Sequence, residues 1–236
     1  MSENRKHPNE FFDKIYCVNL DRRKDRWNHA FDQFDKLGLN VKRISAVDGS
    51  VKKFNKVKSV DPNKMEESLD GHRYISPAEA GITFSHKTIL MDAIANGYDK
   101  ILMLEDDCQF TDNFLNKFTQ TTSELPEDWD LFYLGGQYWL GDPIGYSNRL
   151  NKTNYTLGMH AIGIRSTIFE KMLSLTNLKE PVDVTYAKEQ YKLNSYIAKP
   201  MLINQKEGIF SDIKYRINIV PDTYHDTIIE NEGREA

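Results

Sequence analysis

The sequence predicts an α/β fold, in which a mostly parallel sheet is flanked by helices. Three short apolar runs, at residues 15–18, 101–104 and 131–134, are typical of strands buried on both faces. Segments with helical periodicity lie between these runs, as expected where helices connect parallel strands. Polar or glycine residues follow the runs, so we expect the functional groups at the carboxyl edge of the sheet, where open α/β sheets bind ligands.

The composition limits the class of protein. The chain has 236 residues, enough for one large domain or two small ones with a sizeable core, and its 39% hydrophobic and 28% charged residues are those of an ordinary soluble globular protein. We expect the domain at residues 11–220, with a polar excursion at 50–74 and polar tails at 1–10 and 221–236. The net charge of −4 gives no reason to expect nucleic acid as a partner.

The expected compartment is the cytoplasm. No apolar run approaches the roughly 20 residues needed to span a bilayer, and residues 1–10 lack the apolar centre of a signal peptide. Peripheral association with a membrane stays open. Two cysteines, Cys17 and Cys108, are too few for a disulfide scaffold, so we expect both to be buried thiols on strands in a reducing compartment.

The first expected strand, at residues 15–18, leads into a strongly basic segment. Asp21 is the expected N-cap of a helix that extends to residue 37, and Gly38 is its expected stop. These basic side chains can hold a phosphate through charge-assisted hydrogen bonds, or they can pair with aspartates on a solvated helix face. The residues alone favour neither interpretation. The basic residues are Arg22, Arg23, Lys24 and Arg26.

A second strand is expected at residues 41–47, and it closes on Asp48 and Gly49. Asp48 either accepts hydrogen bonds from a ribose or base, as strand-end acids do in nucleotide-binding folds, or belongs to a simple turn. The local sequence leaves both interpretations open.

A capped helix is expected after the polar excursion. Ser76, Pro77 and Glu79 form the pattern of a capping box with proline at the first helical position, and Gly97 marks the end of the helix. His86 lies near the middle of this helix, where a lone histidine is more often structural than catalytic.

Three carboxylates follow the apolar run at residues 101–104: Glu105, Asp106 and Asp107. Strand alternation would place Glu105 and Asp107 on one side and Asp106 on the other. Neighbouring anions repel one another, and burying them without compensation would be very costly. A divalent cation that carries a nucleotide diphosphate would relieve the repulsion, and oxygen ligands suit Mg²⁺ or Mn²⁺. The simpler alternative is a solvated acidic loop.

The C-terminal half continues with shorter elements. Gly135 and Gly136 end the strand at residues 131–134 and permit close approach by a ligand or a loop. Asp183 lies at an expected helix start, where the helix dipole favours the charged form of a carboxylate. The other expected elements are helices at 111–118 and 166–175, strands at 156–164 and 196–203, and a loop at 205–212.

Seven sequence blocks occur in the order that is typical of a known family. They are YCVNLDRR at 16–23 with Asp25 and Arg26, AVDG at 46–49, EAG with SH at 79–86, LEDD at 104–107, DWDL with glycine at 128–135, PVD at 181–183 and SD at 211–212. Through them the chain resembles the family 25 glycosyltransferases, which include lipopolysaccharide sugar transferases and the collagen hydroxylysine galactosyltransferases, over about residues 15–213. Ala78 stands where the family's helix motif usually has its first glycine, which concerns only local helix packing.

The resemblance implies a GT-A-like, Rossmann-type single domain and a metal-dependent, inverting glycosyltransferase. Such an enzyme would move a hexose, galactose or glucose, from a UDP-sugar to a hydroxyl group of a glycan or protein acceptor, with Mn²⁺ or Mg²⁺ as cofactor. A bound metal would stabilise the charge that develops on the diphosphate leaving group. Direct inversion forms no covalent intermediate, so a base must take the proton of the acceptor hydroxyl. By resemblance, Asp183 would be this base, with Asp212 as the competitor.

The resemblance also implies ligands for the metal and the nucleotide. Asp107 would be the direct metal ligand, with Glu105 in the same site, and Gln205 or Asp212 would complete the metal shell. Glu105 and Asp106 would also contact metal-bound water, the ribose or sugar hydroxyls. The remaining nucleotide contacts would come from Asn19, Arg22, Arg23, Arg26 and Asp48.

Two alternatives come from other classes of protein. A phosphatase of the haloacid dehalogenase type uses two aspartates at i and i+2, the first as nucleophile, whereas the corresponding pair here is Glu105 and Asp107. A non-catalytic sugar-nucleotide-binding or scaffold protein on the same fold would keep the acidic motif without turnover. Metal-dependent turnover would exclude the scaffold, and phosphate release from simple monoesters would favour the phosphatase.

Overall fold

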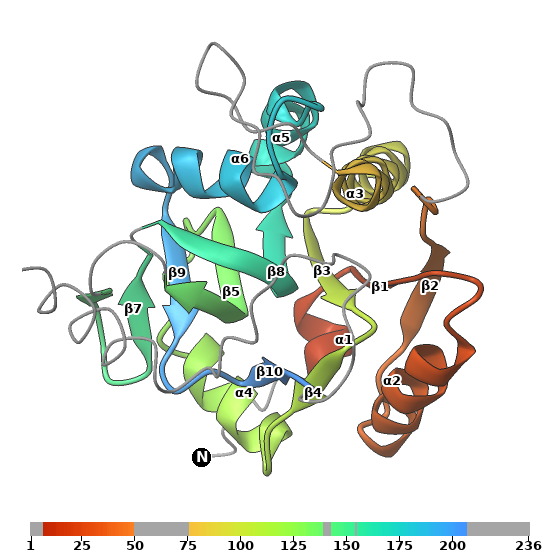
Figure 1. Ribbon diagram of the computed structural model, residues 1–236. Helices are drawn as coiled ribbons and strands as arrows, with labels where there is room; N and C mark the ends of the chain where they lie inside the picture. Colours follow the sequence, from red (N-terminus) through yellow and green to blue (C-terminus); the bar gives the residue numbers. More distant parts are fainter. Residues whose placement is uncertain (1–6, 50–75, 139–142, 154, 207–236) are drawn as a thin grey trace, which may run out of the picture.

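The computed structural model describes residues 7–49, 76–138, 143–153 and 155–206 (Figure 1). Within these ranges, one eight-stranded sheet has the strand order β2-β1-β3-β8-β5-β9-β7-β6. Its strands are β1 (Lys14–Asn19), β2 (Val41–Ser45), β3 (Lys100–Glu105), β5 (Leu131–Tyr138), β6 (Ile144–Gly145), β7 (Leu150–Lys152), β8 (Thr156–Arg165) and β9 (Ser195–Ala198).

The strands of this sheet mostly point in one direction. β1 is parallel to both β2 and β3, and β5 is parallel to β9. β8 runs antiparallel between β3 and β5, so these two neighbours of β8 point the same way. The expected α/β fold with a mostly parallel sheet is therefore confirmed. The carboxyl ends of β1, β2, β3, β5 and β9 lie at one edge, which we call the carboxyl edge.

Helices cover both faces of the sheet, and a hydrophobic core lies under each group of helices. In Figure 1 the first group lies below the sheet and the second above it. The first group is α1 (Pro8–Phe11), α2 (Lys24–Lys36) and α4 (Phe114–Thr122). The second group is α3 (Pro77–Ala95), α5 (Phe169–Leu175) and α6 (Val182–Glu189), with 3₁₀ turns at Ser166–Ile168 and Gln190–Lys192.

The apolar run in β3 explains why there is a core on each face. Leu102 and Leu104 belong to the core beneath α2 and α4, whereas Ile101 and Met103 belong to the core beneath α3 and α5. All four side chains are almost completely buried. Because strand side chains alternate, a strand covered by helices on both faces needs a continuous apolar run, and polar residues begin where β3 leaves the core.

The capping box predicted at the start of α3 is confirmed. The Ser76 hydroxyl accepts a hydrogen bond from the Glu79 N–H at 3.2 Å, and the Glu79 carboxylate accepts one from the Ser76 N–H at 2.7 Å. Such a cap is worth about 1 kcal/mol of helix stability. The helix ends at Ala95, and Gly97 follows with a positive φ of 66°. The prediction that Gly97 marks the end of this helix is therefore confirmed.

The expected N-cap of α2 is wrong. Arg23, and not Asp21, occupies the N-cap position. The Asp21 carboxylate instead accepts hydrogen bonds from Arg43 Nη2 and Ser45 Oγ of β2, each at 2.7 Å, so it ties the loop to the neighbouring strand. Gly38 follows the helix with a φ of 64°, as expected for a helix stop.

The late strand expected at residues 196–203 is wrong in its extent. β9 ends at Ala198, and a separate strand β10 (Ile203–Gln205) pairs antiparallel with β4 (Cys108–Phe110). Pro200, which has no N–H to donate to a sheet, lies between the two strands. The helix expected at residues 111–118 likewise begins only at Phe114.

Several expectations concern the ends and the compartment of the chain. α1 begins at Pro8, within the segment expected as an N-terminal tail, while the excursion at 50–74 and the tail at 221–236 lie outside the described residues. Within the described ranges, no helix is both long and apolar enough to cross a bilayer. Cys17 and Cys108 are buried on β1 and β4 as expected, and burial raises the pKa of both thiols.

Candidate functional site

The three carboxylates that follow β3 lie at the carboxyl edge of the sheet. β3 ends at Glu105, and Asp106 and Asp107 form a turn into β4. We call these three residues the acidic turn. The expectation that Asp106 and Asp107 face opposite sides is wrong, because the extended backbone ends before them and both contact the same guanidinium, that of Arg26.

Arg26 is the cation that compensates the acidic turn. Its Nη2 atom lies 2.6 Å from Asp106 Oδ1 and 2.7 Å from Asp107 Oδ2. Arg26 is only 8% exposed and Asp106 only 6%, so this contact replaces the water that both charges lose. Burial raises the pKa of Asp106, while the charge of Arg26 and the hydrogen bond from Asn19 oppose that rise. Arg26, which the resemblance assigns to the nucleotide site, therefore contacts carboxylates in this structure.

Asn19 supports the acidic turn from below. Its amide nitrogen donates to Asp106 Oδ2 at 2.6 Å and to the Arg23 carbonyl at 3.0 Å. Its carbonyl oxygen accepts from Arg43 Nε at 3.0 Å and from Arg43 Nη2 at 2.7 Å. Asn19 is 1% exposed, and both ends of its carboxamide are hydrogen-bonded to groups of the protein.

Arg43 was not singled out by the sequence patterns. It lies inside an ordinary strand, β2, away from the basic segment that opens α2. Only the parallel register of β1 and β2, which sets Cys17 opposite Arg43 and Asn19 opposite Ser45, brings the guanidinium to Asn19. The contact between Arg43 and Asn19 can therefore be predicted only when the register of β1 and β2 is known.

One carboxylate oxygen of Asp107 is buried without a hydrogen-bond partner among the described residues. Oδ2 contacts Arg26, whereas Oδ1 is buried and has no hydrogen-bond partner within the described residues. A buried acceptor without a partner is costly, and an ion or a water molecule can satisfy it. The backbone oxygen of Asp107 accepts the Lys206 N–H at 2.8 Å, which brings the end of β10 to the turn.

Gln205 reaches the acidic turn through β10. The β4–β10 ladder pairs Gln205 with Cys108, the residue after Asp107. The Gln205 carboxamide oxygen accepts a hydrogen bond from Gln137 Nε2 at 3.2 Å. The structure thus brings the predicted ligand Gln205 beside Asp107, although β10 and not a loop carries it.

The acidic turn fits a divalent cation that is shared with a phosphate ligand. Within the described ranges, no three His, Cys, Asp or Glu side chains come together as a closed metal cage. Mg²⁺ and similar ions at nucleotide sites are typically held by one or two carboxylates, water and the phosphates themselves. The unpartnered oxygen of Asp107 would be such a ligand; Glu105 is its neighbour in sequence, and Gln205 lies across the β4–β10 ladder from the next residue.

The other predicted nucleotide residues pair with aspartates. Arg22 Nε lies 2.8 Å from Asp48 Oδ2, and this pair joins the start of α2 to the loop after β2. Arg23 donates from Nε and Nη2 to both carboxylate oxygens of Asp25, at 3.0 and 2.9 Å. The pairing interpretation of this basic segment is therefore realised in the structure. Exposed pairs of this kind are weak, about 0–1 kcal/mol, so an arriving phosphate can compete for the arginines.

The start of α3 holds the loop that carries Asp48. A Cβ on Gly81 would lie 2.2 Å from the Val47 oxygen, so only glycine allows the helix to approach so closely. Ser85 Oγ accepts the Val47 N–H at 2.9 Å and donates to the Gly81 oxygen at 2.7 Å. His86, the next residue in α3, is buried, and burial lowers its pKa to about 4.

Asp183 lies at the same edge of the sheet as the acidic turn. It is in the first turn of α6, where Oδ1 accepts the Val184 N–H at 2.9 Å and Oδ2 accepts the Gly158 N–H at 3.4 Å. β8 pairs Ala161 with Leu104 and continues past the end of β3, so Gly158 lies beyond the end of β3. In the extended register His160 lies opposite Glu105, and Gly158 lies two residues, or about 7 Å, further along β8. Asp212, the competing base, lies outside the described residues.

The glycine pair that follows the predicted strand at 131–134 allows strand β10 to approach closely. A Cβ on Gly135 would lie 1.9 Å from the Ile203 oxygen and 2.3 Å from His160 Nε2. His160 Nε2 and the Ile203 oxygen are themselves 3.2 Å apart. Gly135 therefore permits β10, which carries Gln205, to lie against β5 and β8. Of the two alternatives, a ligand or a chain segment, the structure shows the chain segment.

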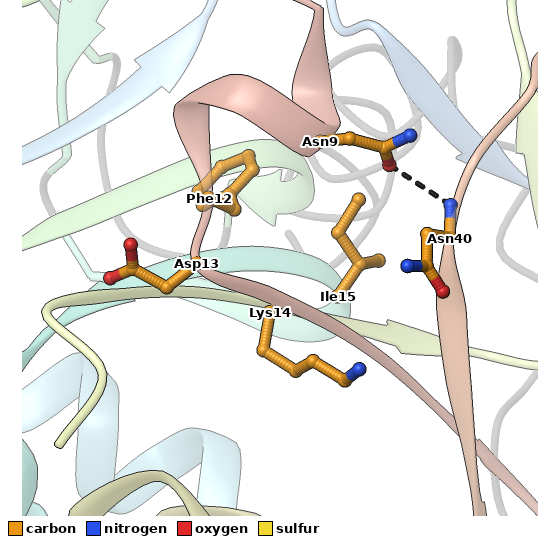
Figure 2. Close-up of a pocket in the computed structure, with 6 residues that line it drawn as sticks. All are labelled: Asn9, Phe12, Asp13, Lys14, Ile15 and Asn40. Atoms are coloured by element: carbon orange, nitrogen blue, oxygen red, sulfur yellow. Dashed lines mark hydrogen bonds between the residues drawn. The ribbon is translucent and has the colours of Figure 1, made fainter. Parts of the chain in front are cut away.

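A small cavity lies at the opposite edge of the sheet (Figure 2). Its volume is about 50 Å³, far below the roughly 300–1,000 Å³ of sites for small molecules. Figure 2 shows the hydrogen bond that closes one side, from the Asn40 N–H to Asn9 Oδ1 at 2.9 Å. It lies at the start of β1 and has room for water, not for a sugar nucleotide. The lining residues are Asn9, Phe12, Asp13, Lys14, Ile15 and Asn40.

Comparison with known proteins identifies relatives of the chain. The family model described as "Glycosyltransferase family 25 (LPS biosynthesis protein)" matches residues 12–141. A glycosyltransferase 25 family member from Aedes aegypti is 33% identical over 125 residues, which are 51% of this chain and 21% of the relative. Procollagen galactosyltransferase 2 from Homo sapiens is 26% identical over 230 residues, with 84% of this chain and 36% of the relative covered. The chain thus spans 21–36% of the length of these relatives.

Other matches include a relative that is named as inactive. Inactive glycosyltransferase 25 family member 3 from Homo sapiens is 26% identical over 129 residues, which are 52% of this chain and 22% of the relative. Among solved structures, A197 from STIV has a TM-score of 0.45 at 12% identity and covers 86% of this chain and 99% of its own. A glycosyltransferase involved in glycosylation of the major capsid of PBCV-1 has a TM-score of 0.36 at 13% identity, with 70% and 66% covered.

Proposed function

The chain belongs to glycosyltransferase family 25, and we propose that it transfers a hexose, galactose or glucose, from a UDP-sugar to a hydroxyl group of a glycan or protein acceptor. The relatives named procollagen galactosyltransferases support galactose and a hydroxyl acceptor, and the lipopolysaccharide role in the family description supports a glycan acceptor. Donor, acceptor, metal dependence and inversion at the sugar carbon all belong to the proposal.

The buried, unpartnered Oδ1 of Asp107 is the observation that carries the proposal. Arg26 compensates the charge of Asp107 through Oδ2, so the turn is stable when no metal is bound. The second oxygen, Oδ1, can then accept a metal ion without displacing Arg26. Asp107 would hold Mn²⁺ or Mg²⁺, with Glu105 and Gln205 completing the protein's share of the ligands. Such an ion, when bound, supplies Lewis-acid stabilisation of the departing diphosphate.

The chain's own residues would then position the donor and take the proton. Arg22, half exposed at the carboxyl edge, can leave Asp48 for a phosphate, and Asp48 can then accept hydrogen bonds from the ribose or base. Asp183 would accept the proton of the acceptor hydroxyl as its oxygen bonds to the sugar carbon and the bond to the diphosphate oxygen breaks. Asp212 stays the alternative base.

A second candidate function is a non-catalytic sugar-nucleotide-binding or scaffold protein on the same fold. The relative named as inactive, 26% identical over 129 residues, is the observation that favours it. This candidate shares donor binding with the transferase and differs from it in turnover alone.

Calorimetric titration of UDP tests the proposal. We expect binding in the presence of Mn²⁺ and its loss when a chelator removes the metal. UDP-galactose and UDP-glucose are then offered with a hydroxylysine peptide or a lipopolysaccharide acceptor, and product formation separates the transferase from the scaffold. A protein that binds UDP neither with Mn²⁺ nor without it would contradict both candidate functions.

A further inference from the structure

We propose that Arg43 is a positioning residue of this site. Its guanidinium fixes the orientation of the Asn19 carboxamide, and the carboxamide holds the acidic turn in the form that accepts a cation. The role assigned to the turn rests on the proposed function. The contact between Arg43 and Asn19 stands without it and can be tested by itself.

The contact with Arg43 permits only one orientation of the Asn19 amide. Arg43 Nε and Nη2 lie 3.0 and 2.7 Å from Asn19 Oδ1. A guanidinium donates hydrogen bonds and cannot accept them, so the amide atom that faces it must be the oxygen. The amide nitrogen must then face Asp106 Oδ2, which accepts from it at 2.6 Å. In the flipped amide, an oxygen would face the carboxylate and an amino group would face the guanidinium, so both contacts would be lost.

Arg43 is itself held in place before any ligand arrives. Its Nη2 lies 2.7 Å from Asp21 Oδ1, and its guanidinium carbon lies 5.3 Å from the centre of the Trp27 ring. The cation–π contact keeps the guanidinium beside the Trp27 ring, and the exposed ion pair with Asp21 contributes little. Because Arg43 is part of a strand and not of a loop, its backbone is also fixed by the β1–β2 ladder. The donor fork is therefore preorganised toward Asn19.

The orientation of Asn19 reaches Asp107 through two shared contacts. Asp106 accepts from Asn19 on Oδ2 and from Arg26 on Oδ1. The same Arg26 nitrogen also lies 2.7 Å from Asp107 Oδ2. Without the hydrogen bond from Asn19, the Asp106 carboxylate can rotate and draw Arg26 away from Asp107. The unpartnered oxygen of Asp107 would then lose the fixed direction that a cation needs.

Two readouts in a small set of variants test the inference. The first is hydrogen exchange of the Asn19 side-chain amide in the metal-free protein, followed by NMR. The second is the affinity for Mn²⁺, measured from the electron paramagnetic resonance signal of the free ion. We expect Arg43→Met to speed the exchange and to weaken Mn²⁺ binding, each by about tenfold, the scale of one lost charge-assisted hydrogen bond.

Matched variants separate positioning from general damage. Arg43→Lys keeps the charge without the fork and should lie between wild type and Arg43→Met; it also carries the test if Arg43→Met does not fold. Asp21→Asn removes the exposed ion pair of Arg43 but leaves the bonds to Asn19, so both readouts should stay within about twofold of wild type. Unchanged amide exchange in both Arg43 variants would overturn the inference, as would equal losses in Asp21→Asn.

A double-mutant cycle shows whether Arg43 acts through Asn19. If it does, Arg43→Met should weaken Mn²⁺ binding when Asn19 is present, and should change the affinity little when Asn19 has been replaced by alanine. Fully additive losses would mean that Arg43 acts by another route, and the inference would fail. If the wild type itself binds no Mn²⁺, the proposed function fails, while the amide exchange of Asn19 alone still decides whether Arg43 orients it.

Discussion

Arg26 and Asp107 form a half-satisfied pair: Nη2 of the arginine lies 2.7 Å from Asp107 Oδ2, while Asp107 Oδ1 is buried without a partner in the described part of the chain. The arginine keeps the turn stable in the absence of a metal, because a buried anion needs a cation nearby. Under the proposed function, the remaining oxygen would bind the metal.

Asp107→Asn should abolish Mn²⁺-dependent binding of UDP while the protein stays folded. The amide keeps the size of the carboxylate and an oxygen for Arg26, but it lacks the negative charge that makes a carboxylate a much stronger ligand than an amide for a hard divalent cation. Calorimetry with UDP and Mn²⁺ measures the loss, and thermal unfolding checks the fold. Asp112→Asn, an exposed aspartate soon after β4, is the control and should bind like wild type. Retained binding in Asp107→Asn would remove Asp107 from the metal site.

Asp183→Asn should lower turnover at least ~100-fold and leave UDP binding unchanged, since only the transfer of the acceptor proton needs the carboxylate. Steady-state kinetics and calorimetry give the two values. Glu180→Gln, which alters another carboxylate at the start of the same helix, should keep turnover close to wild type. If Asp183→Asn turns over normally, the base is another acid, with Asp212 as the first to examine.

The sheet and the position of the acidic turn could be predicted from sequence because their signals are local. A strand covered on both faces needs a continuous apolar run, and the carboxylates that end one such run, at Glu105 to Asp107, had to emerge at an edge of the sheet. Asp183 was placed correctly at the start of a helix by the residues around it.

The partners of these carboxylates could not be predicted in the same way. Arg26 stands in a basic segment that suits phosphates and aspartates equally well, and the choice depends on the turn after β3, far away in sequence. Arg43 reaches Asn19 only through the register of two parallel strands. The N-cap of α2 was wrong for the same reason, because Arg43 and Ser45 of β2 take the Asp21 carboxylate away from the helix.

Gly135→Ala should destabilise the protein and displace β10. The new Cβ would lie 1.9 Å from the Ile203 oxygen, a backbone atom that cannot move alone, so we expect a loss of roughly 1–3 kcal/mol or more in the free energy of unfolding. Urea unfolding measures the loss. Gly145→Ala is the matched control in another strand, since its Cβ would meet no atom within 4 Å. Equal stabilities of the two variants would contradict the close packing of β10 on β5.

His86 should make the stability of the protein depend on pH. The ring is 2% exposed, its Nδ1 has no hydrogen-bond partner within the described residues, and burial lowers its pKa to about 4, against an ordinary value near 6.5. Between these two values the unfolded chain binds a proton that the folded protein does not, so protonation favours unfolding. Stability from this group is complete above about pH 6.5 and falls as the pH drops toward 4.

His86→Gln isolates that contribution, because glutamine stays neutral throughout this range. From pH 7 to pH 5, the free energy of unfolding should fall by about 2 kcal/mol more in wild type than in the variant. Urea unfolding of both proteins at the two pH values gives the difference, and titration of the other groups cancels between them. Parallel pH dependences would mean that His86 is solvated in the folded protein. In that case α3 would pack less closely on the sheet and on the Asp48 loop, in conflict with the close contact between Gly81 and Val47.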